Sequence, residues 1–299
     1  MHLYSGDAPR DRDVTDEQLT AEFEEQRSHL RAVAYRMLGS VNEADDAVQE
    51  AWLRASRADT SEVENMRAWL TTVVARVSLS MLRSRKAKRE EPLDVHVPEP
   101  IVSGRDGLQP EQEALLADSV GLALLVVLET LSPAERLAYV LHDMFSVPFD
   151  DIAAIVERSP AATRQLASRG RRRVEGEATV PDPDLGRQRE VVGAFMAASR
   201  EGDFEGLVAV LHPDVVLRAD MALGVSRQVR GAEAVAAQAR MYRERDRFSR
   251  LALVNGAAGM VVASDEQTYA VLGFTVADGK IVAIDILADP DRLARLDLP

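Results

Sequence analysis

Apolar residues recur every three or four positions through the first part of the chain, which is the spacing of one face of a helix. Gly39 ends the first such segment, a second segment starts near Asn42, and a third runs over residues 65–85. The pattern predicts an all-α block over residues 21–90. We expect residues 1–20, which are mostly polar and lack the pattern, to be disordered.

Prolines and glycines break the helical pattern at two places. The first break, over residues 91–110, predicts an extended linker, and helical spacing then returns over residues 111–175. The second break, a linker over residues 176–186, precedes one or two helices and several strand-like runs. Asp278-Gly279 between the last two runs is a strong hairpin signal. The pattern predicts a multidomain chain with two all-α helical domains and an α+β domain over residues 187–299.

The second helical block has the order of a helix-turn-helix. Ser132-Pro133 and Ser159-Pro160 each combine a capping serine with proline at the first helical position. The helix after Ser159 carries arginine and glutamine outward, which suit contacts to guanine and adenine edges, and further arginines that suit phosphates. The predicted DNA-binding residues of this helix are Ser159, Ala161, Arg164, Gln165, Ser168, Arg169, Arg171, Arg172 and Arg173.

The distribution of charge fits a nucleic-acid binder better than the total charge does. The formal net charge is −13, yet residues 76–89 and residues 158–173 each hold six basic groups and no acid. The local potential within roughly 10 Å decides contact with DNA, so two basic runs that each close an amphipathic helix favour phosphate binding. A solvated helix face remains the alternative for either run taken alone.

The composition removes several classes of function. With no cysteine, the chain has no disulfide, thiolate metal site or cysteine nucleophile. No metal-ligand spacing is present, and we expect neither a metal nor a cofactor. No apolar run approaches the roughly 20 residues that cross a bilayer, and the polar N-terminus does not have the pattern of a signal peptide. We therefore expect a cytoplasmic protein with no membrane partner.

Three segments resemble regions of bacterial sigma factors. Residues 43–54 resemble the core-polymerase-binding helix of sigma region two, and residues 67–76 resemble the helix that melts and reads the −10 element. Residues 131–173 resemble region four, which reads the −35 element. Their order and spacing over residues 21–175 resemble the extracytoplasmic-function group. The resemblance implies a factor that binds core RNA polymerase and promoter DNA and directs promoter-specific transcription initiation.

The resemblance also implies roles for charged residues. Three acids of the second predicted helix are spaced i, i+3 and i+7 on one face, and in the family this face docks on a basic coiled coil of the polymerase large subunit. Residues 58–89 would melt the −10 element and residues 159–173 would recognise the −35 element. The implied polymerase-binding residues are Glu43, Asp46, Gln49 and Glu50. The implied −10 residues are Asn65, Arg67, Arg76, Arg83, Arg85, Lys86 and Lys88.

The last third of the chain resembles the cone-like SnoaL-type domain of the SigJ-like subgroup of these sigma factors. Residues 97–104 resemble the proline-containing linker of that subgroup, and residues 288–293 resemble its closing Asn-Pro-Asp-Lys-Leu motif. Where the subgroup often has an Asp-Gly-Gly-Gly motif, residues 220–226 contain a single glycine. We expect the domain to modulate sigma activity. The residues expected to make the regulatory contact are Asp289, Pro290, Asp291, Arg292 and Leu293.

Two other functions stay open from the residues alone. A helix-turn-helix regulator would bind DNA without polymerase, and a DNA-tethered enzyme would act on a small molecule in the SnoaL-like domain. The residues argue against catalysis, because the domain has one histidine, His212, in a predicted turn, and Asp220, Asp285 and Tyr269 as its further polar candidates for a pocket. We expect no enzyme activity, while an unknown small ligand of this domain stays an open alternative.

Overall fold

The structure is a computed structural model of the chain, and it describes residues 11–88, 96–104, 121–177, 179, 181–221, 226–241 and 248–298. Within these ranges, none of the helices has a stretch that is both long enough and apolar enough to span a lipid bilayer.

Three helices form the first helical block. They are α1 (Asp11–Leu38), α2 (Val41–Ala55) and α3 (Met66–Lys88). The expectation of disorder is wrong for residues 11–20, which belong to α1, while residues 1–10 lie outside the described residues. Leu19 lies one turn before Phe23 on the same face, and both side chains are buried, so packing extends the helix toward the N-terminus.

The turn between α1 and α2 is fixed by two adjacent residues. Gly39 has a φ of +70°, a left-handed conformation that favours glycine. Ser40 caps α2, because its side-chain oxygen accepts a hydrogen bond from the backbone N–H of Glu43 (3.2 Å). This turn therefore sets the direction in which α2 leaves α1.

The second helical block confirms both predicted serine caps. Its helices are α5 (Leu122–Glu129), α6 (Pro133–Tyr139), the π-helix η1 (Val140–Met144), α7 (Phe149–Val156) and α8 (Pro160–Glu177). Ser132 and Glu135 form a capping box at the start of α6. Ser159 Oγ accepts from the backbone N–H of Ala162 (3.2 Å) at the start of α8. Glu157 adopts a left-handed conformation, with a φ of 57°, and makes the tight turn between α7 and α8.

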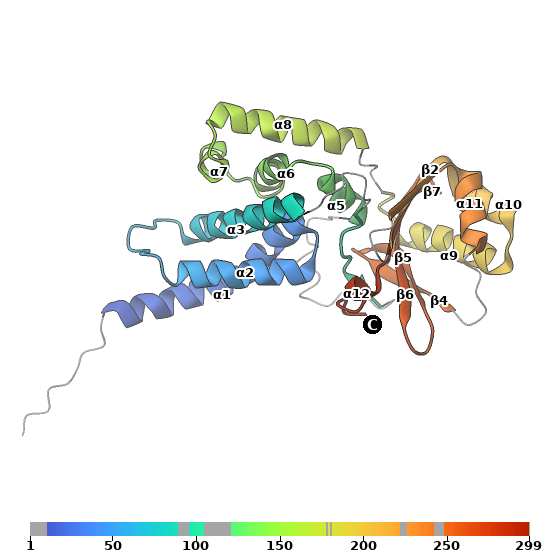
Figure 1. The fold of residues 1–299 in the computed structure, drawn as a ribbon, viewed down its shortest axis with the longest axis horizontal. Coiled ribbons are helices and arrows are strands. Elements are labelled where there is room, and N and C mark those ends of the chain that lie inside the picture. Colours follow the sequence, from blue (N-terminus) through green and yellow to red (C-terminus); the bar gives the residue numbers. More distant parts are fainter. Residues whose placement is uncertain are drawn as a thin grey trace, which may run out of the picture.

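The two helical blocks share one hydrophobic core. Buried side chains from Phe23 in α1 to Val174 in α8 belong to a single cluster. Helix α3 lies between α1 and α2 on one side and α6 and α7 on the other (Figure 1). The two α-helical domains, although separated by a linker in the sequence, are packed against each other in this structure.

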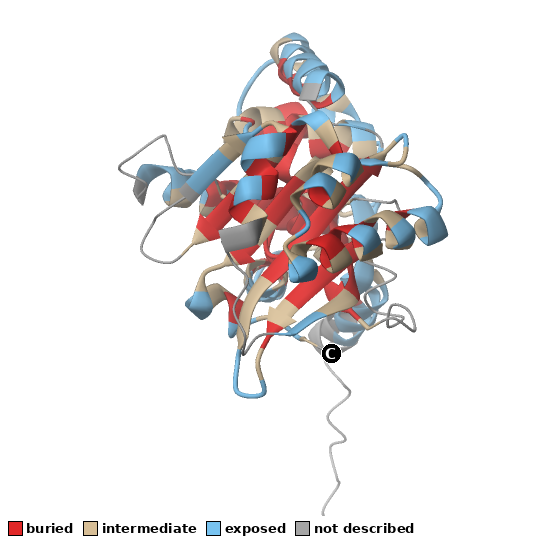
Figure 2. Cartoon of the chain, turned by 90° about the vertical axis from the view of Figure 1, so that its right-hand side faces the viewer, coloured by how far each residue is buried: buried red, intermediate tan, exposed pale blue. Residues whose placement is uncertain are grey.

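The C-terminal domain contributes six strands to a seven-stranded sheet, and its first three helices cover one face of that sheet. Its elements are α9 (Leu185–Glu201), α10 (Phe204–Val210), β2 (Leu211–Met221), β3 (Ser226–Arg230), α11 (Ala232–Met241), β4 (Phe248–Val254), β5 (Ala257–Ala263), β6 (Thr268–Ala277), β7 (Lys280–Ala288) and α12 (Pro290–Leu293). With β1 (Val102–Ser103), the strand order is β1-β4-β5-β6-β7-β2-β3, and only the β2–β7 pair is parallel. Helices α9 to α11 cover the inner face over buried apolar side chains (Figure 2). The predicted hairpin is confirmed, since Asp278 and Gly279 both have positive φ, as a two-residue turn requires.

The outer face of the sheet packs on the rest of the chain. Strand β1 comes from the predicted linker and pairs antiparallel with β4 at the edge of the sheet. Linker, α5 and α12 side chains form a third core with outward side chains of the sheet. At its centre Leu122 of α5 sits over Gly273 of β6, where an added Cβ would lie 2.6 Å from Leu122 Cδ2. The C-terminal domain therefore holds both the linker and the second helical block (Figure 1).

Candidate polymerase-binding and DNA-binding surfaces

The outward face predicted for α8 is exposed. Leu166 and Ala167 on the opposite face are buried in the shared core. The guanidinium carbon of Arg164 lies 5.5 Å from the ring centre of Phe149, a cation–π contact that supports this side chain at the surface. Helix α8 forms an outer edge of the molecule in Figure 1. The exposed residues of the face are Ala161, Arg164, Gln165, Ser168 and Arg172.

Three arginines expected to contact phosphates are bonded within the second helical block. Arg169 Nε donates to the carboxylate of Glu135 (2.8 Å), and Arg171 pairs with Asp143. Arg173 donates to a backbone carbonyl oxygen at the end of α5 (3.0 Å). In this arrangement these arginines attach α8 to the helices beneath it, a role that the sequence pattern did not indicate.

The acidic face of α2 is only partly open. Asp46 and Gln49 are exposed. Glu50 pairs with an arginine one turn along the same helix (2.8 Å). Glu43 lies against the guanidinium of Arg85 from α3. The open part of the predicted polymerase-binding face is therefore centred on Asp46 and Gln49.

The basic residues of α3 fall into two groups. Arg76, Arg83 and Lys86 are exposed. The side chain of Arg85 is only 19% exposed, because it lies between acids of both helical blocks. The side chain of Lys88 lies outside the described part of the chain. Three of these cations are thus available for phosphates in the present arrangement, and Arg85 is not.

The first turn of α3 uses two predicted DNA-binding residues in its own structure. Asn65 Oδ1 accepts the backbone N–H three residues along (3.0 Å), which caps the helix. Arg67 Nη2 lies 3.3 Å from His29 Nδ1, and Thr71 Oγ1 lies 3.1 Å from His29 Nε2. Burial, together with the charges of Arg67 and Arg36, lowers the pKa of His29 to about 4. The ring is therefore neutral near pH 7.

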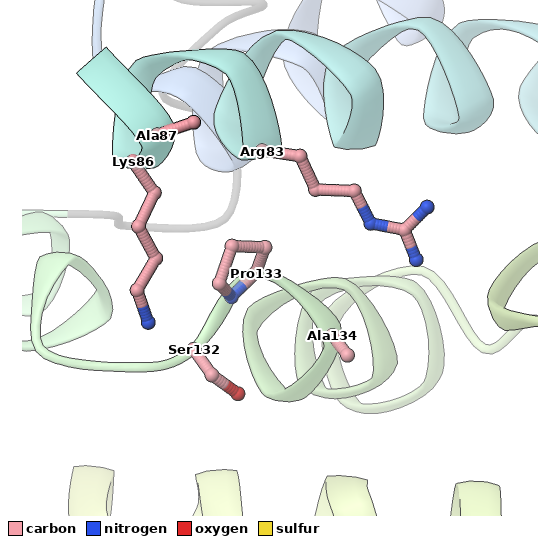
Figure 3. Close-up of a pocket in the computed structure, with 6 residues that line it drawn as sticks. All are labelled: Arg83, Lys86, Ala87, Ser132, Pro133 and Ala134. Atoms are coloured by element: carbon pink, nitrogen blue, oxygen red, sulfur yellow. The ribbon is translucent and has the colours of Figure 1, made fainter.

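A groove of about 380 Å³ lies between the two blocks at the end of α3. Figure 3 shows Lys86 reaching from α3 down beside Ser132 and Pro133, while Arg83 extends over α6 on the side of Ala134. Cations predicted to follow the −10 strand therefore face the second helical block. The lining residues are Arg83, Lys86, Ala87, Ser132, Pro133 and Ala134.

Buried charges join the two blocks beside the turn at Gly39. Glu129 Oε1 accepts from Arg136 Nη1 (2.6 Å), and Arg136 Nε donates to the carbonyl oxygen of Arg36 at the end of α1 (3.1 Å). Burial alone would raise the pKa of Glu129, but Arg136 and neighbouring cations lower it to about 2. The sequence pattern did not indicate this pair, although Glu129 directly follows an apolar run over residues 122–128, which is a signal for a buried acid that needs a partner.

The C-terminal motif meets the linker at a second junction. Arg292 Nη1 donates to the carboxylate of Asp220 (2.5 Å), Nη2 donates to the carbonyl oxygen of Val97 (2.7 Å), and Nε lies 3.4 Å from Glu99 Oε1. Burial would raise the pKa of Asp220, but a hydrogen bond from His96 and the charge of Arg292 lower it. We call the set formed by Arg292, Asp220, His96, the carbonyl group of Val97 and Glu99 the linker junction.

Glu99 extends the linker junction to α2. Its carboxylate accepts from Ser40 Oγ (2.5 Å), the cap of α2, and its N–H donates to the carbonyl oxygen of Gly39 (2.7 Å). Past the C-terminal motif, the carbonyl oxygen of Arg295 accepts from the side chain of Asn42 (3.3 Å). The end of the chain therefore lies at the first turn of the predicted polymerase-binding helix.

Comparisons with known proteins identify the two helical blocks. The family model for Sigma-70 region 2 matches residues 23–88, and the model for Sigma-70, region 4 matches residues 121–174. Over 289 residues the chain is 41% identical to the ECF RNA polymerase sigma factor SigJ of Mycobacterium tuberculosis, which covers 91% of this chain and 92% of that protein. The chain belongs to the ECF sigma factors.

Two further similarities extend over nearly the whole chain. The probable ECF RNA polymerase sigma factor SigI of Mycobacterium tuberculosis is 33% identical over 279 residues, which covers 92% of this chain and 94% of that protein. The crystal structure of Mycobacterium tuberculosis SigJ matches with a TM-score of 0.73 and 38% identity, covering 94% of this chain and 100% of that one. The expected fold class is confirmed: helical sigma regions two and four followed by an α+β, SnoaL-like domain.

This ECF sigma factor binds core RNA polymerase and directs promoter-specific initiation, as the sequence predicted. The first helical block is its region two and the second is its region four. Helix α2 carries the region-two face implied to bind polymerase, and α8 is the second helix of the helix-turn-helix in region four.

Two polar candidates of the SnoaL-like domain, Asp220 and Asp285, lie on the face of the sheet opposite helices α9 to α11. Side chains on either side of Asp220 and Asp285 in the strands pack on the inner face, so these two acids face outward. Asp285 is buried against Arg218 (3.0 Å), and burial raises its pKa above the ordinary value although Arg218 opposes the shift. His212 lies in β2 and not in the predicted turn. The pairing of β2 with β7 is irregular between Leu211 and Val216, and His212 Nδ1 accepts the backbone N–H of Asp214 (3.1 Å).

Proposed function

We propose that this sigma factor alternates between the closed arrangement described here and an open one on polymerase. The positions of the −10 and −35 elements differ by about 25 base pairs, which is roughly 85 Å of B-form DNA at about 3.4 Å per base pair. Regions two and four cannot reach both elements while α3 and α6 share one hydrophobic core. This shared core is the observation that carries the proposal.

Docking on polymerase is assigned to α2. Asp46 and Gln49 are exposed in the closed state and make the first contact with the basic coiled coil of the large subunit, with Glu50 beside them. Glu43 joins after it leaves Arg85. Acids at the rim of an interface steer the partner and raise the rate of association more than they raise affinity.

Opening of the −10 element is assigned to the loop over residues 58–64 and to the cations of α3. Unstacking a base costs a few kcal/mol, so a pocket and a cationic track must offset that cost. Arg76 is exposed, and Arg83 and Lys86 line the groove beneath region four. Separation of region four exposes this track fully.

Recognition of the −35 element is assigned to α8. Arg164 and Gln165 suit bidentate readout of guanine and adenine, and Arg172 suits a phosphate. Their exposure in the closed state supports this division of roles. Arg169 and Arg171 support α8 from within region four and are half-exposed, so they serve phosphates only after rearrangement.

The C-terminal domain is proposed to modulate opening. It holds the linker twice, by β1 at the sheet edge and by Arg292 at the linker junction. A linker held in this way cannot extend between two separated regions. We assign no catalysis to this domain, because Asp220 and Asp285 are engaged with arginines on its outer face, and we place the activity in the cytoplasm with RNA polymerase.

Transcription in vitro with core polymerase on a library of promoters tests the proposal. The full chain should give promoter-selective transcripts, and Arg292→Ala, which removes the centre of the linker junction, should raise their yield at limiting polymerase. Arg200→Ala, an exposed arginine of α9, is the matched control. Failure of the wild-type chain to bind core polymerase would refute the function, and equal yields from wild type and Arg292→Ala would refute the regulation.

A further inference from the structure

Arg85 lies between two carboxylates that come from different parts of the sigma factor. Arg85 Nη2 contacts the carboxylate of Glu43 in α2 and also donates a hydrogen bond to the carbonyl oxygen of Leu38 (3.0 Å). The Nη1 atom lies 3.8 Å from Glu129 Oε1 at the end of α5. Its neighbour Arg83 on the same helix is exposed. Arg85 is therefore set apart from the other cations of α3 by two acids.

The charges continue into region four. Glu129 is shared between Arg85 and Arg136, so acids and arginines alternate from α2 through α3 and α5 to α6. The chain of charges is closely packed against the turn after α1, where a Cβ added at Gly39 would lie 3.1 Å from Glu129 Oε1. Arg136 is 2% exposed, so this end of the chain of charges is held in the core.

Two residues with separate proposed roles thus neutralise each other. Glu43 belongs to the polymerase-binding face and Arg85 to the phosphate-binding track. We propose that Arg85 is an internal counter-ion that links these roles. Polymerase binds Glu43, and separation of region four moves Glu129 away from Arg85. Arg85 then becomes available to a DNA phosphate. The inference rests on the proposed function of α2 and α3.

Exchange of partners makes the two binding events cooperative. A ligand that binds Glu43 breaks its ion pair with Arg85, which frees Arg85 to bind a phosphate. A phosphate that binds Arg85 breaks the same ion pair and frees Glu43. Each ligand must then raise the affinity for the other by the same factor. A partly buried ion pair of this kind supports an effect of about fivefold.

The first test measures binding of core RNA polymerase to the full chain without DNA. Arg85→Gln should bind about fivefold more tightly than wild type, because Glu43 is no longer neutralised. Arg85→Lys, which keeps the charge, should stay close to wild type. Arg200→Gln makes the same change in net charge at an exposed site of α9 and should leave the affinity unchanged.

The second test approaches the pair from the other side. In the absence of polymerase and at low salt, Glu43→Gln should raise the affinity of the full chain for a fluorescent oligothymidylate of about 20 nucleotides by about fivefold. Glu205→Gln, an exposed acid of α10, controls for the change in net charge. This test stands even where Arg85→Gln fails to fold.

The outcomes separate the inference from the function beneath it. Tighter polymerase binding by Arg85→Gln, or tighter DNA binding by Glu43→Gln, beyond their controls supports the counter-ion. If neither variant binds more tightly than its control, the counter-ion is overturned while the sigma function stands. A wild-type chain that does not bind core polymerase overturns both.

Discussion

The side-chain amide of Asn255 donates a hydrogen bond to the hydroxyl of Tyr35 (2.9 Å) across 220 positions of the sequence. Tyr35 donates in turn to the carbonyl oxygen of Glu99 (3.1 Å), and Asn255 Oδ1 accepts the backbone N–H of Ile101 (2.9 Å). Tyr35 and Asn255 are both buried. One set of hydrogen bonds therefore ties the SnoaL-like domain, the linker and helix α1 of region two together.

Removal of the Tyr35 hydroxyl should weaken this connection. Tyr35→Phe takes the donor from the carbonyl oxygen of Glu99 and the acceptor from Asn255, so the free energy of unfolding should fall by about 1–3 kcal/mol. Urea titrations of the full chain measure the change. In a double-mutant cycle with Asn255→Ala the two losses should be less than additive, and full additivity would contradict a direct pairing.

A methyl group at the turn after α1 should disturb the contact between regions two and four. Gly39→Ala places a Cβ 3.2 Å from Pro98 and 3.1 Å from Glu129 at a φ of +70°, and should cost about 1–3 kcal/mol of unfolding free energy. Gly193 of α9 is the control, because an added Cβ there has no neighbour within 4 Å. Gly193→Ala should be neutral or stabilising by up to about 1 kcal/mol. Equal thermal stability of the two variants would show that the turn is not crowded.

Protonation of His29 should weaken the closed arrangement. The ring lies 5.3 Å from Phe145 of region four, and its pKa is lowered from 6.5 to about 4. Between these values the unfolded chain binds the proton and the folded chain does not, so stability falls as the pH falls from 6.5 to 4 and is flat just above that window. Melting temperatures across the window test this, and His29→Gln should reduce the slope. The contribution of Glu129, whose pKa is lowered from 4.5 to about 2, is lost between these two values, mostly below the His29 window.

Charge reversal on α8 should remove promoter selection without affecting polymerase. Arg164→Glu combined with Gln165→Glu removes the two proposed contacts to base edges, and a contact of this kind contributes about 1–3 kcal/mol of discrimination. Transcription that depends on a −35 element should therefore fall by about tenfold or more, while binding to core polymerase stays unchanged. Arg200→Glu, which reverses the charge of an exposed arginine of α9, provides the control. Survival of promoter selection in the double variant would place the recognition surface elsewhere.

Features encoded locally were predictable from the sequence. The caps at Ser132 and Ser159 and the turn at Asp278-Gly279 depend on neighbouring residues and on backbone conformation, and the structure confirms them. The exposed face of α8 follows from helical spacing in the same way. The helix over residues 11–20 was not predicted, because Leu19 is one of few apolar residues there. Its burial depends on residues that are distant in the sequence.

Features that depend on long-range contacts were not predictable. Arginine-rich spacing identified Arg171 as a phosphate contact, but its partner Asp143 comes from η1, in another part of the fold. Alternation along a strand assigns residues to two faces but does not say which face is covered by the helices. The outward position of Asp285 therefore became known only from the packing of the sheet. The pairs Arg85–Glu129 and Tyr35–Asn255 join regions whose contact no local pattern encodes.

The separation of regions two and four tests the closed-state account most directly. The chain has no cysteine, so dyes can be attached at Glu25→Cys on α1 and Ala154→Cys on α7, which are both exposed. Energy transfer between the dyes should be high in the free full chain and should fall when core RNA polymerase is added. Transfer that stays high while the chain is bound to core polymerase would contradict the account.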